Sequence, residues 1–305
     1  MSADKPLVSI VVPTYKRSDR IRVALDSIAA QDYGAENIEL IVVSDNRPEW
    51  PESAETDTAV APYAASLPHF RLLRTSGQTG GGAARNYACR QATGEYLTFL
   101  DDDDEFLPDK VSTQVAFMQE NSLDMSWQDV SWYDERGRLV EHRRLDHCED
   151  FSTEGLLRAH LLTPISPTAI YMLRRDLFDR TEGFGEVATG QDWWLMLRCI
   201  EAGAHMGYMP EVHVRQYLHS GERLSLGKNK VNGEVARHEV VRGYYPRLSK
   251  KDVRYIEFRH NAVLAFAMKR SNQPGQAVIY ALKAIASSPA ACVSEALKFF
   301  GKAKS

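Results

Sequence analysis

Four short runs of apolar, largely β-branched residues recur in the first hundred positions, and segments with helical spacing lie between them. The runs cover residues 7–12, 38–43, 70–74 and 95–100. Continuous apolar runs of this length predict buried strands, and their alternation with helices predicts an α/β fold with a parallel, doubly wound sheet. Ligands of such sheets bind beyond the carboxyl ends of the strands. The polar residues that follow each run are therefore the first candidates for a functional site.

Four consecutive aspartates, Asp101–Asp104, follow the fourth run directly. Carboxylates this close repel one another, so such a run either faces water or binds a cation. Because a buried strand delivers it to the ligand-binding edge, we predict a hard divalent cation, Mn²⁺ or Mg²⁺, shared with substrate phosphates. An EF-hand loop fits poorly because its glycine and distant glutamate are missing. A solvated acidic loop is the alternative.

The composition excludes several classes of protein. Among 305 residues there are 37 Lys and Arg and 41 Asp and Glu, so the net charge of −4 argues against a nucleic-acid binder. The four cysteines form no CxxC pair, which fits a reducing cytoplasm. The first residues do not resemble a signal peptide, and no apolar stretch approaches eighteen residues. We therefore expect a cytoplasmic protein without a transmembrane helix.

Three segments, VSIVVPTYKR, IVVSDN and ARNYACRQATGEYLTFLDDDDEFLP, resemble the N-terminal half of family 2 glycosyltransferases. The resemblance continues through GFGE and GQDWWLMLR to about residue 220. It implies the GT-A fold, a Rossmann-like and mostly parallel sheet flanked by helices. It also implies inverting transfer of a sugar from a nucleotide-sugar donor to a saccharide or lipid-linked acceptor.

The resemblance assigns the donor site to the ends of the first two strands. Pro13, Thr14 and Tyr15 match positions that hold the nucleobase, the tyrosine by stacking. Asp45 matches the residue that accepts a hydrogen bond from the uracil N–H, which favours a UDP-sugar. Ser44 replaces the other member of the usual acidic pair. From the residues alone, Tyr15 could equally cover the sheet edge, and Asp45 could form an Asx turn.

The diphosphate and metal are assigned by the same resemblance to the acidic run and its neighbours. Asp101 and Asp103 match the DxD motif, with Asp103 as the metal ligand and Asp102 close to the ribose or the metal. Arg85 matches an arginine near the diphosphate; an exposed helix charge is the alternative. His219 either completes the metal site or contacts the diphosphate, or it is an ordinary surface histidine. The glycine run at 80–82 fits no phosphate-loop pattern and is interpreted as a flexible loop before a helix.

GQDWWLMLR matches the segment that carries the general base, which makes Asp192 the predicted catalytic residue. Gln191 stands where the family has an acidic residue. A helix dipole stabilises a carboxylate at the N-terminus of the helix and so favours the deprotonated form that a base requires. The alternative is that Asp192 only caps the helix.

Two other functions stay open from the residues. A nucleotidyltransferase would share the sheet and the metal, but its Gly-rich first loop is replaced by PTYKR. A non-catalytic sugar-binding or scaffold protein is kept open by Ser44 and Gln191. Release of nucleoside diphosphate would indicate sugar transfer, release of pyrophosphate would indicate a nucleotidyltransferase, and release of neither would indicate the non-catalytic protein.

The net charge hides two regions of opposite sign. Residues 228–305 hold 15 basic and 5 acidic residues (+10), and residues 1–227 hold 22 and 36 (−14). We predict a GT-A domain over 1–227, with a nucleotide-binding half at 1–108 and an acceptor half at 109–227, followed by a basic helical extension. That extension could lie on the inner face of the cell membrane as a peripheral contact, or pack on the acidic domain or a second subunit in an oligomer.

Overall fold

The computed structural model describes residues 5–219 and 227–302. The chain divides into two compact units, each described by itself below. Unit 1 comprises residues 1–160, 165–187 and 191–221, and unit 2 comprises residues 161–164, 188–190 and 222–305.

The first half of unit 1 is the parallel sheet that the apolar runs predict. The strands lie in the order β3-β2-β1-β4, all parallel to their neighbours. The interiors of β1, β2 and β4 are buried on both faces, which explains their continuous apolar sequence, whereas the edge strand β3 is only half-buried. Their bounds are β1 Val8–Thr14, β2 Ile38–Ser44, β3 His69–Arg74 and β4 Tyr96–Phe99.

The second half of the sheet is mixed, so the predicted mostly parallel sheet is correct only for β1–β4. β8 (Met172–Arg174) runs antiparallel to both β4 and β6 (Met125–Asp134). β9 (Met206–Leu218) pairs in parallel with β6, and the short β5 (Glu105–Phe106) pairs antiparallel with β9. β5 and β9 thus bring the end of the acidic run beside the chain that leads to His219.

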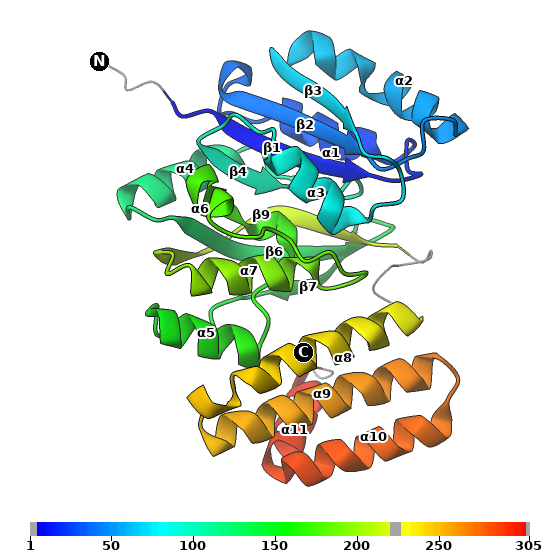
Figure 1. Cartoon of the computed structure of the whole chain (residues 1–305), viewed down its shortest axis with the longest axis vertical. Coiled ribbons are helices and arrows are strands. Elements are labelled where there is room, and N and C mark those ends of the chain that lie inside the picture. Colours follow the sequence, from blue (N-terminus) through cyan, green and yellow to red (C-terminus); the bar gives the residue numbers. More distant parts are fainter. Residues whose placement is uncertain (1–4, 220–226, 303–305) are drawn as a thin grey trace. The chain divides into compact units, whose positions relative to one another are not determined.

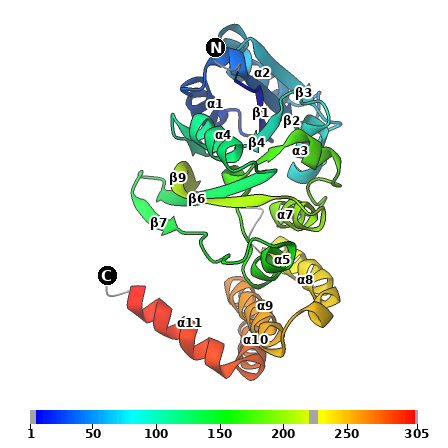
Figure 2. The same ribbon diagram turned by 90° about the vertical axis from the view of Figure 1, so that its left-hand side faces the viewer.

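The helices of unit 1 cover both faces of the sheet (Figures 1 and 2). Figure 2 shows α1 and α4 on one side and α3 and α7 on the other. A hairpin extends the sheet where β6 pairs with β7 (Leu139–Arg143), turning at Gly137. The remaining bounds are α1 Ile21–Ala29, a 3₁₀ turn Ala35–Asn37, α2 Pro51–Ser66, α3 Gly81–Cys89, α4 Lys110–Glu120, α5 Thr153–Leu162, a 3₁₀ turn Thr168–Ile170, α6 Arg175–Asp179 and α7 Gln191–Glu201.

Register brings the predicted site residues to one edge of the sheet. Thr14, the last residue of β1, pairs with Ser44, the last residue of β2. β4 runs beside β1 on its other side and ends just before Asp101. The residues that follow three neighbouring strands therefore converge, as expected for the carboxyl edge of a parallel sheet.

Unit 2 is a layer of helices in which α9 (Lys250–Arg270) lies between α8 (Gly227–Gly243) and α10 (Pro274–Ser287) (Figure 1). A 3₁₀ turn, Tyr245–Arg247, joins α8 to α9, and α11 (Pro289–Lys302) follows α10. No single helix among the described residues is long and apolar enough to cross a membrane. Only α10 and the start of α11 meet that test as a pair, and they are bent by 109°.

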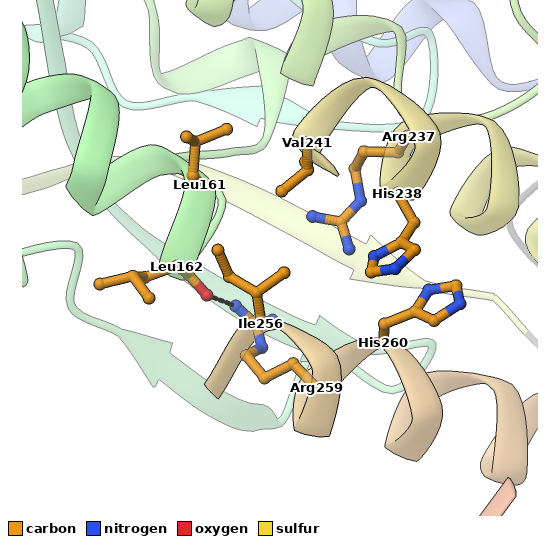
Figure 3. Close-up of a pocket in the computed structure, with 8 residues that line it drawn as sticks. All are labelled: Leu161, Leu162, Arg237, His238, Val241, Ile256, Arg259 and His260. Atoms are coloured by element: carbon orange, nitrogen blue, oxygen red, sulfur yellow. Dashed lines mark hydrogen bonds between the residues drawn. The ribbon is translucent and has the colours of Figure 1, made fainter. Parts of the chain in front are cut away.

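The contact between α8 and α9 contains two stacked histidines. The rings of His238 and His260 lie 3.7 Å apart at 11°, and His260 Nδ1 lies 3.0 Å from Oε1 of the buried Glu234. Figure 3 shows both rings beside Arg259, whose guanidinium donates to the carbonyl of Leu162. The cavity between these residues is only about 10 Å³, roughly the size of one water molecule, so it offers no room for a ligand.

Candidate functional site

Thr14 and Asp102 join the end of β1 to the acidic run. The buried Thr14 hydroxyl donates a hydrogen bond of 2.7 Å to Oδ2 of Asp102. Burial, together with the neighbouring Asp103, raises the pKa of Asp102 to about 7, although Arg17 and Thr14 favour the charged form. Both residues were predicted from the sequence, and they meet at the expected edge.

Arg17 is a site residue that the sequence analysis did not identify. Its Nη1 lies 2.7 Å from Oδ2 of Asp103 and 3.3 Å from Oδ1 of Asp102. The guanidinium thus bridges two of the four carboxylates, and repulsion within the acidic run is partly offset. Burial still raises the pKa of Asp103. The position of Arg17 three residues after β1 is the only sequence signal for this role.

Asp103 and His219 approach each other, as the resemblance implies. Nε2 of His219 lies 3.6 Å from Oδ2 of Asp103. Carboxylate oxygens and an imidazole nitrogen suit Mn²⁺, and the surrounding negative charge favours a cation. Within the described ranges, no group of three or more His, Cys, Asp or Glu side chains is set to hold a metal. The donor set therefore fits a cation that takes one or two protein ligands and the rest from a diphosphate. The segment that follows His219, residues 220–226, lies outside the described residues.

Asp104 has a structural rather than a ligand-facing environment. It is buried, and its carboxylate accepts hydrogen bonds from the Gln216 side chain (2.6 Å) and the Tyr217 backbone N–H (3.1 Å). These bonds fasten the acidic run to β9 and so fix the start of the segment that carries His219. Of the four aspartates, Asp101, Asp102 and Asp103 instead form ion pairs, with Arg85, Arg17 or His219.

Tyr15 lies at the rim of the site with 39% of its surface exposed. Its ring lies 6.2 Å from that of Trp50 at an interplanar angle of 58°. Nζ of Lys16 lies 4.0 Å from the centre of the Trp50 ring. Tyr15 is exposed and Trp50 is half-buried, so Tyr15 is the ring that can offer a π face to a planar group, and the cation beside the pair suits an anionic one. Pro13, the penultimate residue of β1, contributes backbone to the same edge.

Asp45 is buried and holds the loop between β3 and α3. Its carboxylate accepts hydrogen bonds from the Thr75 hydroxyl (2.5 Å), the Thr79 hydroxyl and N–H (2.7 and 2.9 Å) and the Gly80 N–H (2.8 Å). These four bonds match the usual capacity of a carboxylate. The interpretation of the glycine run as a flexible loop was wrong, because Gly80 is pinned by Asp45 and the next two glycines belong to α3.

Arg85 connects the acidic run to the N-terminus of α7. It is buried, and its guanidinium donates to the Asp101 carboxylate on one side and to Oε1 of Gln191 (2.9 Å) on the other. The alternative of an exposed helix charge was therefore wrong. Gln191 stands where the resemblance predicts an acidic residue. Arg85 still has a hydrogen-bond acceptor at this position, because the amide oxygen of Gln191 accepts its bond.

Asp192 is the half-buried second residue of α7 and follows Gln191, the partner of Arg85. Its Oδ1 accepts a hydrogen bond of 3.0 Å from the Trp193 N–H. Burial is the largest influence and raises the pKa of Asp192, whereas that hydrogen bond and Arg85 oppose the rise. The backbone N–H groups at the helix N-terminus do favour the charged form, as expected, but desolvation outweighs them and the net shift of the pKa is upward. A raised pKa makes the carboxylate a better proton acceptor near neutral pH.

A second link between α3 and the α7 side was also missed. The Asn86 side chain donates to the Phe184 carbonyl (3.0 Å) and accepts from the Phe184 N–H (2.8 Å). Gly82 allows the backbones to approach, since a Cβ there would lie 2.3 Å from the Gly185 carbonyl oxygen. Together these contacts set the distance between the helix that carries Arg85 and the loop before Asp192.

The comparison with known families agrees with this geometry. The profile described as glycosyl transferase family 2 matches residues 9–181, which is more than half of the chain. The chain belongs to glycosyl transferase family 2. The resemblance seen in the sequence is thereby confirmed, and the family consists of enzymes of the glycosyltransferase class.

Individual relatives and solved structures are also similar to this chain. An uncharacterised glycosyltransferase of Rickettsia bellii is 31% identical over 194 residues, covering 59% of this chain and 26% of that protein. The crystal structure of S. aureus TarS 1–349 with UDP-GlcNAc has a TM-score of 0.60 at 19% identity, covering 90% of each chain. The mannosyltransferase PcManGT from Pyrobaculum calidifontis, with GDP-Man and Mn²⁺, has a TM-score of 0.61 at 21% identity, covering 97% and 80%. The predicted GT-A fold is thus confirmed.

The curated relatives are longer than the part that this chain matches. The chain spans about a quarter to a third of the length of the first of them, from 26% to 35%. The structural neighbours lie below 25% identity and establish the fold alone.

Proposed function

We propose that this glycosyltransferase moves a sugar from a nucleotide-sugar to an acceptor hydroxyl by a single displacement with inversion, with Asp192 as the base. One observation carries the proposal. Arg85 contacts both Asp101, at the start of the acidic run, and Gln191, the neighbour of Asp192. Arg85, a cation that suits a diphosphate, is thereby held close to Asp192, a carboxylate that suits an acceptor hydroxyl.

The chemistry follows from these positions. Asp192 accepts the proton of the acceptor hydroxyl while that oxygen forms a bond to the anomeric carbon. The bond between that carbon and the diphosphate oxygen breaks, and nucleoside diphosphate leaves with the electron pair. Arg85, buried and fixed on two sides, is preorganised to stabilise the negative charge that develops on the diphosphate. No covalent intermediate on the protein is required.

Asp103 and His219 would hold a divalent cation, Mn²⁺ or Mg²⁺, with Asp101 and Asp102 beside it. When bound, the cation would neutralise charge on the diphosphate. The 3.6 Å approach of His219 to Asp103 supports this set. One structural neighbour was solved with Mn²⁺ and another with UDP-GlcNAc, which makes a metal and a nucleotide-sugar reasonable choices for this chain.

The donor base is proposed to lie between Tyr15 and the end of β2. Tyr15 supplies an exposed ring that leans on the half-buried Trp50, and Thr14, its neighbour in sequence, donates a hydrogen bond to Asp102. Uridine is the proposed base because Asp45 follows β2. The Asp45 carboxylate already accepts four hydrogen bonds, so a uracil N–H would have to share or replace one of these four donors. The acceptor is proposed to be a saccharide or lipid-linked glycan that reaches the N-terminus of α7.

A product assay tests the proposal. The protein is incubated with a panel of UDP-, GDP- and dTDP-sugars and Mn²⁺, and free nucleoside diphosphate and pyrophosphate are both quantified. We expect nucleoside diphosphate with one class of donor, and its loss on chelation of the metal. Pyrophosphate as the product would instead support a nucleotidyltransferase. Binding of a sugar without any turnover would support the non-catalytic alternative.

A further inference from the structure

Helix α10 is apolar in composition, but most of its side chains are not buried. It is 14 residues long with a single charged side chain, Lys283, yet only Ala284 is buried. A helix that is apolar nearly all round is normally found in a protein core or a membrane. Its large apolar residues are instead between 46% and 62% exposed; these are Val278, Ile279, Leu282 and Ile285.

The exposed apolar residues form a face and are not scattered. Val278, Leu282 and Ile285 recur at helical spacings of four and three, so they lie along one side of α10. α9 packs on another side of α10 (Figure 1). α11, which follows after a 109° bend, carries two more exposed apolar residues four positions apart, Val293 (61% exposed) and Leu297 (67%). We call these five residues the α10–α11 face.

Basic side chains border this face. Lys269 and Arg270 end α9 immediately before α10, and Lys283 lies on α10 itself. An open groove of about 690 Å³ runs beside α10, and its lining includes Lys283, Arg242 and the two stacked histidines, with Glu257 as the acidic member. Residues 228–305 carry a net charge of +10. An apolar face with cationic borders is complementary to a surface that is apolar inside and anionic outside.

From this complementarity, we propose that the α10–α11 face docks on an anionic lipid bilayer. The two helices lie along the interface, with their apolar side chains among the acyl chains and Lys269, Arg270 and Lys283 at the phosphate level. Neither helix alone is long enough to span, which favours an interfacial position. A second copy of the chain is the less suitable occupant, since it would bring another unit of charge +10 against the same borders. The docking surface is independent of the proposed transfer chemistry.

Vesicle co-sedimentation of the full chain tests the proposal. We expect binding to phosphatidylcholine vesicles with about 30% phosphatidylglycerol and roughly tenfold weaker binding to pure phosphatidylcholine. Binding should weaken when salt rises from about 0.1 to about 0.5 M. Leu282→Asp should reduce binding roughly tenfold, because a charge enters the acyl region. Leu139→Asp is the matched control, since Leu139 is a leucine of similar exposure (57%) in unit 1, and it should bind as the wild type does.

Other results of the same experiment would contradict the docking proposal. Equal sedimentation of the wild type with neutral and anionic vesicles, or unchanged binding of Leu282→Asp, overturns the proposal. If the wild type is a dimer that Leu282→Asp converts to a monomer, with no vesicle binding by either, the face contacts a second copy instead. Nucleoside diphosphate release in solution, measured on the same variants, should be unchanged. Failure of docking is thus distinguished from failure of the proposed enzyme function.

Discussion

Nη1 of Arg17 lies 2.7 Å from Oδ2 of Asp103, so the carboxylate predicted to bind a metal already has a cationic partner. A guanidinium and a divalent cation compete for the same oxygen by Coulomb attraction. We therefore expect Arg17 to weaken the binding of a metal ion to the nucleotide-free protein.

Replacing Arg17 with Met should strengthen Mn²⁺ binding by the nucleotide-free protein. An opposite charge within about 4 Å typically changes the affinity of a carboxylate for a cation by about tenfold or more, and we expect a gain of that size. Titration calorimetry with Mn²⁺ measures it. Arg138→Met removes an exposed Arg–Asp pair elsewhere and serves as the control. Equal or weaker Mn²⁺ binding by Arg17→Met would show that Arg17 does not compete at this site.

Asp192→Asn should lower turnover by about 10²- to 10⁴-fold, the usual contribution of a general base, and leave donor affinity nearly unchanged. Asp176→Asn, an exposed carboxylate on α6, is the matched control. The wild-type rate should also fall as the pH falls, because a base works only when deprotonated. Burial raises the pKa of Asp192, so this fall should begin at a higher pH than for an exposed aspartate. A wild-type turnover number in the Asn variant would remove Asp192 from this role.

Asp45→Asn should release the loop that the carboxylate pins. The amide can accept at only one of its two terminal atoms, whereas Asp45 accepts at both. We expect faster hydrogen exchange at the Gly80 N–H together with weaker UDP binding. If Asp45 only contacts the nucleobase and does not hold the loop, Asp45→Asn would change the affinity for UDP but leave hydrogen exchange at the Gly80 N–H at the wild-type rate.

Lys110 supplies a prediction about stability. It is fully buried, its side-chain nitrogen donates to the Thr98 hydroxyl, and burial lowers its pKa well below the usual range. The unfolded chain therefore binds this proton more tightly than the folded chain does, so stability should rise with pH between the lowered pKa and the ordinary lysine value. Lys110→Met should stabilise the fold at pH 7 by about 1–3 kcal/mol and flatten this slope. Urea unfolding at several pH values measures both, and a less stable Met variant would contradict the argument.

The sequence predicted the parts of the fold and site that depend on local pattern. Strand runs and register explain why Thr14, Asp45 and Asp101 share one sheet edge. Arg85 and Asp101 could be associated with each other because both lie in one continuous matching segment. The positions of the other predicted site residues were likewise read from motifs, and their roles stay predictions.

The contacts that depend on distant pairing could not be read this way. Arg85 meets Gln191 across 106 residues, and Asn86 meets Phe184 across 98, and neither residue type signals such a partner. Arg17 was missed because a basic residue after a strand is ordinary in loops. The mixed second half of the sheet was missed because short strands such as β8 carry too little pattern to reveal their direction.

The close approach of Gly82 to the Gly185 carbonyl is made by backbone on both sides, with no flexible side chain between them. In the proposed reaction, this contact would set how far the leaving group stands from the attacking hydroxyl. Any side chain at position 82 would push these partners apart, and catalysis is sensitive to shifts of about 1 Å. Altering the acceptor of this enzyme by design should therefore leave residues 82–86 and 183–186 intact and change side chains farther from that contact.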